Sequence, residues 1–151
     1  MEKITTPKQA LERAKWLCAK QERCQSEIYK KLKEWGIEEE NSEEIITQLI
    51  IENFIDEKRF AQLYSRSKFN QLKWGRIKIS YELKQKGISE KCIQYGLQEI
   101  DNKVYIKTLQ KEIEKKTKEL KENNTFILKN KIIKYFYSKG YEPELTIELL
   151  K

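Results

Sequence analysis

Apolar residues recur at helical spacing in three short stretches of this chain, and each stretch ends in a glycine followed by one more apolar residue. The stretches are residues 28–37, 79–88 and 132–141. Apolar side chains four positions apart lie on one face of a helix, and glycine just past the last turn adopts the left-handed conformation that other residues resist. The three glycines are 51 and 53 positions apart. A unit that recurs at a nearly fixed period predicts a modular helical chain.

Capping residues and apolar spacing together predict nine helices in three groups of three. Thr6 before Pro7 favours a helix start, and Asp56 and Ser89 are placed to cap two later helices. Asn41, with a glutamate three residues later, predicts a capping box for the third helix. We therefore expect an all-α fold of three tandem three-helix repeats, in an elongated, curved, solenoid-like chain. The expected repeats are residues 1–55, 56–100 and 101–151.

The helix expected after Asp56 has two distinct faces. Its inward face is predicted to hold four residues, Phe60, Leu63, Tyr64 and Ser67. The opposite face is predicted to hold Arg59, Gln62, Arg66, Phe69 and Lys73. An aromatic side chain within an outward cationic stripe is typical of a binding surface. The alternative interpretation is that Phe69 packs against a neighbouring repeat.

Composition favours several small cores rather than one large core. Charged residues make up 36% of the chain and apolar residues 38%, with only five glycines and two prolines. No apolar run approaches the ~20 residues that span a membrane, and the first residues lack the hydrophobic stretch of a signal peptide. We expect a cytoplasmic protein. The three cysteines, Cys18, Cys24 and Cys92, lack metal-site spacing and are interpreted as helix-packing residues.

The positive charge is concentrated in the middle of the chain. Between Lys58 and Lys91 there are ten cations and only two acids, Glu82 and Glu90. The net charge of the whole chain is +7, so the remaining residues are close to neutral. A localised positive field attracts polyanions or an acidic protein surface. The middle repeat is therefore the expected binding unit.

The residue types that support most catalysis are missing. The chain has no histidine, which excludes Ser-His-Asp and Cys-His arrangements and the commonest transition-metal ligand. It has neither a P-loop nor a G-x-G-x-x-G motif. We expect a binding protein, not an enzyme, without metal or cofactor. The candidate partner-binding residues are Arg59, Arg66, Lys68, Phe69, Lys73, Trp74, Arg76, Lys78, Lys84 and Lys86.

The segment Asn53-Phe-Ile-Asp-Glu-Lys-Arg-Phe-Ala61 resembles the signature of the RecX family, regulators of the bacterial recombinase RecA. The segment from Trp74 to Ile88 is similar to a second family stretch, and Glu22-Arg23, Glu27, Leu32 and Gly36 to a third. Cys24 departs from the family pattern by replacing a capping serine, which predicts a weaker helix start.

The resemblance implies a monomeric modulator that binds the RecA filament along its groove and suppresses recombinase and ATPase activity. The basic middle repeat is compatible with contact to an acidic filament surface, to the enclosed DNA, or to both. The alternative is a protein that binds single- or double-stranded DNA directly, without RecA. Steep loss of affinity with salt would favour this alternative.

Overall fold

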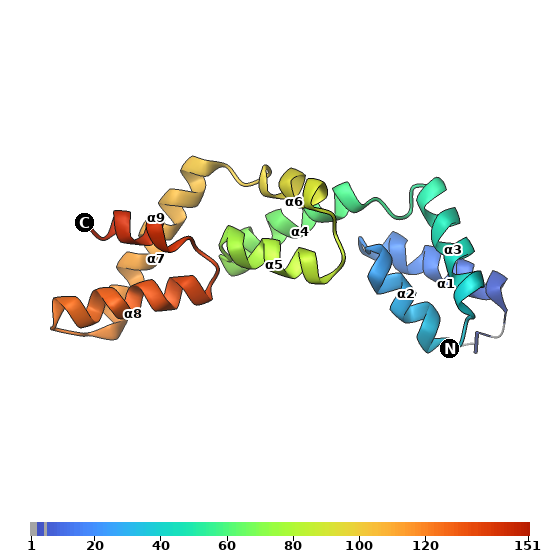
Figure 1. Ribbon diagram of the computed structural model, residues 1–151, viewed down its shortest axis with the longest axis horizontal. Coiled ribbons are helices and arrows are strands. Elements are labelled where there is room, and N and C mark those ends of the chain that lie inside the picture. The colour runs from blue at the N-terminus through green and yellow to red at the C-terminus, as the bar shows by residue number, and fades with distance from the viewer. Residues whose placement is uncertain (1–2, 5) are drawn as a thin grey trace.

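The computed structural model describes residues 3–4 and 6–151, and all the regular structure in them is helical. The helices form an elongated row of three groups, with the first and last groups at opposite ends (Figure 1). We call these groups the first, second and third units. The first unit holds α1 (Pro7–Lys20), α2 (Gln25–Glu34) and α3 (Glu39–Ile51). The second holds α4 (Glu57–Leu72), α5 (Arg76–Gln85) and α6 (Glu90–Leu97). The third holds α7 (Asn102–Leu120), α8 (Thr125–Ser138) and α9 (Pro143–Leu149).

The middle helix of each unit ends in the same glycine closure. Gly36, Gly87 and Gly140 have φ of 77°, 80° and 96°. In each unit the next residue donates its backbone N–H to a carbonyl five positions earlier, as Ile37 does to Leu32 at 3.0 Å. This is the Schellman pattern, which satisfies carbonyls that the helix leaves free. The prediction that a glycine ends the helix in each of the three apolar stretches is confirmed.

Side chains cap three helices at positions expected from the sequence. Thr6, Asp56 and Ser89 each accept a hydrogen bond from the backbone three residues later. The predicted capping box at Asn41 is wrong, because α3 already begins at Glu39 and its N-cap is Glu38. Acidic side chains are stable in a first helical turn, where they face the positive end of the helix dipole. The helix therefore starts earlier than a search for a capping hydroxyl or amide suggests.

The predicted inward face of α4 is only partly correct. Phe60 is buried as expected, but Leu63 is 39% exposed and Phe69 is buried in the core. The true buried side continues through Ala61 and Ser65 because α6 approaches the helix very closely there. A Cβ atom on Gly96 of α6 would lie only 2.6 Å from the carbonyl oxygen of Ala61. This close contact rotates the buried face away from the predicted sector.

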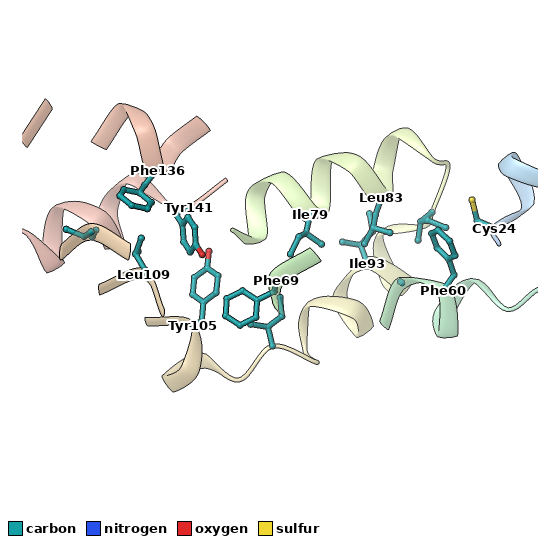
Figure 2. Close-up of a cluster of buried hydrophobic side chains, with 14 of the residues drawn as sticks. Cys24, Phe60, Phe69, Ile79, Leu83, Ile93, Tyr105, Leu109, Phe136 and Tyr141 are labelled. Carbon is teal, nitrogen blue, oxygen red and sulfur yellow. The ribbon is translucent and has the colours of Figure 1, made fainter. Parts of the chain in front are cut away.

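The buried side chains form two clusters, although the chain has three units. The first unit has its own core, which includes Ala14, Leu32 and Leu49. The second and third units share one continuous core, which runs from Phe60 to Phe136 (Figure 2). Among the described residues of the first unit, only Cys24 joins this shared core. The second and third units are thus packed together as one body.

The junction between the second and third units combines aromatic packing with backbone hydrogen bonds. The ring centroid of Tyr105 is 5.7 Å from that of Phe69 and 5.1 Å from that of Tyr141. Gly75 donates its backbone N–H to the carbonyl of Lys139 at 2.8 Å. A Cβ atom on Gly75 would lie 2.3 Å from the backbone of Gly140, so only glycine fits at this position. Contacts of this kind hold the two units in a fixed relation.

The junction between the first and second units is mainly polar. Arg59 Nε lies 2.7 Å from a carboxylate oxygen of Glu22, and Lys86 Nζ lies 3.3 Å from Glu27. Ser26 donates its hydroxyl to the carbonyl of Lys86 at 2.7 Å.

No helix in the part of the chain that the structure describes is both long and apolar enough to cross a membrane.

Candidate partner-binding face

Three lysines and two aromatic rings, from α4, the turn after it, α5 and the C-cap of α5, converge on one face of the second unit. The rings of Tyr64 and Trp74 meet edge to face, with centroids 6.5 Å apart. Lys68 Nζ lies 5.3 Å from the Tyr64 centroid and 5.1 Å from the Trp74 centroid. Lys78 Nζ lies 4.5 Å from the Trp74 centroid, and Lys86 Nζ 5.8 Å from that of Tyr64. We call these five residues the aromatic–lysine cluster.

The turn between α4 and α5 positions the tryptophan of this cluster. Lys73 ends α4 in a left-handed conformation with φ of 58°. Trp74 then donates its backbone N–H to the carbonyl of Lys68 at 3.3 Å. From the third unit, the Tyr141 hydroxyl donates to the Lys73 carbonyl at 2.7 Å. The position of Trp74 therefore depends on a residue 67 positions away in the sequence.

The cluster carries more positive than negative charge. Among the described residues, neither Lys68 nor Lys78 forms an ion pair, whereas Lys86 pairs with Glu27. The face of an aromatic ring attracts a cation without neutralising its charge. Burial, together with nearby carboxylates such as Glu82, raises the pKa of Tyr64 to about 12, so its hydroxyl stays neutral at physiological pH. The face can thus offer two uncompensated ammonium groups beside a flat apolar surface.

Three of the predicted binding residues instead hold the fold together. Phe69 is 5% exposed and packs on Tyr105, so its prediction as an outward residue is wrong. Arg76 pairs with Glu142 at 3.4 Å and lies over the ring of Tyr105. Arg59 binds Glu22 and donates to the carbonyl of Asn53, and the bond to Glu22 raises the pKa of its guanidinium. These side chains have little freedom to meet a partner.

Three further predicted cations lie outside the cluster. Arg66 is paired with Glu99 at 3.4 Å on the α6 side of the unit. Lys73 is exposed at the end of α4, and Lys84 is exposed on α5. The ten predicted residues therefore do not form one stripe. Four of them come together in the cluster, namely Lys68, Trp74, Lys78 and Lys86.

Sequence reasoning assigned Tyr64 to the core, yet this side chain is half-exposed and joins the cluster. A signal for its role was present, because Tyr64 and Lys68 are four residues apart on one helix. Residues at that spacing are neighbours on the helix surface. A tyrosine also carries a polar tip that favours the boundary between core and solvent.

Two family models match this chain, and both describe RecX proteins. The first three-helix domain of RecX matches residues 10–49, and the second three-helix domain matches residues 56–97. The chain is also 37% identical over 117 residues to the regulatory protein RecX of Clostridium tetani. The chain belongs to the RecX family.

Other RecX proteins extend the comparison. The RecX of Clostridium acetobutylicum is 31% identical over 131 residues, which are 84% of this chain and 60% of that protein. The C. tetani match covers 76% of this chain and 53% of the relative, so the chain spans little more than half the length of these relatives. The crystal structure of RecX from Lactobacillus salivarius has a TM-score of 0.85 at 24% identity and covers 95% of this chain and 94% of its own. A further RecX crystal structure has a TM-score of 0.87 at 26% identity, over 95% of this chain and 70% of its own.

The RecX relatives are named regulatory proteins, and their all-helical fold is the fold of this chain. In this chain, the segment that carries the RecX resemblance is structural in character. Asp56 caps α4, Phe60 and Ala61 are buried, and Arg59 joins the first unit to the second. This segment links the first and second units of the chain. The aromatic–lysine cluster lies further along the sequence, in the second unit.

Proposed function

We propose that this chain binds the filament of the recombinase RecA and inhibits its recombinase and ATPase activity. In this role it restrains homologous recombination and the SOS response. One observation carries the proposal: a member of the RecX regulatory family presents Lys68 and Lys78 beside Trp74, and neither lysine forms an ion pair within the described residues. The positive excess of the chain lies in the same unit.

The cluster is suited to an acidic surface because its lysines are already held in place. Each ammonium group lies over an aromatic ring, so less side-chain freedom is lost when an anion binds. Carboxylates of a protein partner and phosphates of its bound DNA both fit this chemistry. The three-unit row supplies a long face on both sides of the cluster (Figure 1).

Reversing the charge of three lysines in the second unit that form no ion pair among the described residues tests this function. We expect the triple variant Lys68→Glu, Lys78→Glu, Lys84→Glu to lose most inhibition of DNA-dependent ATP hydrolysis by RecA. Arg76 is left intact because it binds Glu142 and supports the fold. The matched control reverses three lysines of the third unit that form no ion pair among the described residues, Lys111, Lys129 and Lys134. Equal inhibition by both variants would contradict the proposed face.

Direct DNA binding is the second candidate, and the same unpaired lysines beside Trp74 favour it. A protein that neutralises several phosphates of duplex DNA loses affinity log-linearly with salt, with a slope of about −0.9 per phosphate. Band shifts of naked DNA at physiological salt, without RecA, separate the two functions. Tight binding there would favour the DNA-binding function over the RecA-dependent one.

A further inference from the structure

A groove lies beside the aromatic–lysine cluster, where the first unit meets the second. It has a volume of about 450 Å³ and opens between the end of α1, the start of α2 and the exposed side of α4. Its lining residues are Gln21, Glu22, Glu27, Phe60, Leu63, Tyr64, Ser67, Lys68 and Lys86. Tyr64, Lys68 and Lys86 also belong to the cluster, so the groove extends the same face.

The α4 side of the groove is apolar. Phe60 is almost fully buried, and Leu63 is 39% exposed. The ring of Tyr64 stacks on that of Phe60, with centroids 5.7 Å apart. An open leucine beside two aromatic rings gives an apolar side chain of a partner a place to be removed from water.

The charges around the groove differ in how far they are satisfied. On the first-unit side, Glu22 is bound by Arg59 and Glu27 by Lys86. On the α4 side, Lys68 forms no ion pair within the described residues. One oxygen of Glu22 makes no hydrogen bond among the described residues, but both glutamates have an ion-pair partner. The groove charge that lacks an ion pair is therefore that of Lys68, and it lies at one end of an apolar surface.

The same charges discriminate between two kinds of partner. A nucleic-acid backbone in the groove would bring phosphates close to the carboxylates of Glu22 and Glu27, and like charges repel. A protein segment avoids this repulsion, because it can place a single carboxylate at Lys68 and an apolar side chain at Leu63. The groove thus favours protein over DNA.

We propose that this groove docks an acidic segment of a protein partner, with one apolar side chain of the segment against Leu63 and a carboxylate on Lys68. The inference rests on the proposed function in that RecA is the partner expected to supply the segment. It goes beyond that function because it assigns the protein contact to this groove and not to the lysines alone.

A peptide probe tests the groove without RecA. We expect a short fluorescein-labelled peptide, with a central leucine and a single glutamate near it, to bind the full chain in fluorescence anisotropy. Leu63→Asp should weaken binding by about tenfold or more, because it removes one apolar contact and places a negative charge beside Lys68 and the acidic peptide. The matched control is Ile51→Asp, at another exposed aliphatic residue outside the groove. Equal peptide binding by wild type and Leu63→Asp would overturn the docking site. The site would also be overturned if oligo-dT competes with the peptide for the wild-type chain and this competition is lost in Leu63→Asp.

Experiments with RecA filaments test the groove separately from the proposed RecA function. A photoreactive amino acid at position 63 should cross-link to an acidic segment of RecA, whereas one at position 51 should not. Loss of filament binding in Leu63→Asp supports the groove, and unchanged binding overturns it. If wild type binds the peptide but no filament, the RecA function fails while the groove stands.

Discussion

Glu57, the first residue of α4, lies in an environment that is unfavourable to its charge. One of its carboxylate oxygens is buried without a hydrogen-bond partner among the described residues. Burial raises the pKa of this carboxyl, nearby Glu27 and Asp56 add to the rise, and the backbone amide of Gln25 offsets it only in part. The ionised form of Glu57 therefore costs stability in the folded chain.

This environment predicts a pH dependence. A carboxyl whose pKa is raised on folding binds its proton more tightly in the folded state, so stability falls as pH rises from the unfolded pKa near 4.5 through the raised folded pKa. We expect Glu57→Gln to raise the Tm at pH 7 and to lose this advantage below pH 4.5. Thermal melts of both proteins across this range provide the measurement. A variant that is less stable than wild type at pH 7 would show that the charge is favourable.

At the scale of elements, the two junctions between units differ in strength. The junction of the second and third units buries aromatic rings and excludes any Cβ atom between Gly75 and Gly140. The junction of the first and second units relies largely on ion pairs whose side chains are 23–33% exposed. Ion pairs open to water typically contribute less than about 1 kcal/mol each. The first unit is therefore the more weakly held of the three.

Removing the charges of Glu22 and Glu27 should loosen only this junction. In the double variant Glu22→Gln, Glu27→Gln, with Cys92 replaced by serine, we expect a broader distance distribution between spin labels on α3 and α6. Labels at Gln48 and Gln94 report this distance by electron–electron double resonance. A second pair, Gln94 and Asn130, spans the aromatic junction and should be unaffected. Equal broadening of both pairs would mean that the junctions do not differ.

Elements whose ends depend on local chemistry could be predicted from the sequence. Asp56 and Ser89 cap their helices, and the glycine closures lie where the apolar pattern ends. The buried face of α4 could not be predicted, since it depends on the close approach of Gly96 from another helix. Four residues of the cluster were predicted from the sequence, but Tyr64 was not. Its exposure depends on the neighbouring helices as well as on its position in α4.

At the scale of the whole molecule, the two cores imply two regions of independent stability. Leu32 is fully buried in the core of the first unit, and Leu109 in the core that the other two units share. Replacing a buried leucine by alanine typically costs about 2–5 kcal/mol. Each substitution should therefore weaken its own region and leave the other folded.

Hydrogen exchange monitored by mass spectrometry can resolve these regions. For Leu32→Ala we expect faster exchange in α1–α3 alone. For Leu109→Ala we expect faster exchange in α4–α9 together, because α4–α6 lose the partner on which they pack. A uniform loss of protection along the chain in either variant would show a single cooperative unit.

Tyr141 directly follows Gly140, and its hydroxyl group predicts where mutations that truncate this protein should disrupt it. It holds the Lys73 carbonyl and so fixes the turn that carries Trp74, although no residue of the third unit belongs to the cluster. A stop codon just before Tyr141 would preserve every lysine and ring of the cluster but remove this support. Alleles that abolish regulation are therefore expected far downstream of the codons for the cluster residues that we propose to contact the partner.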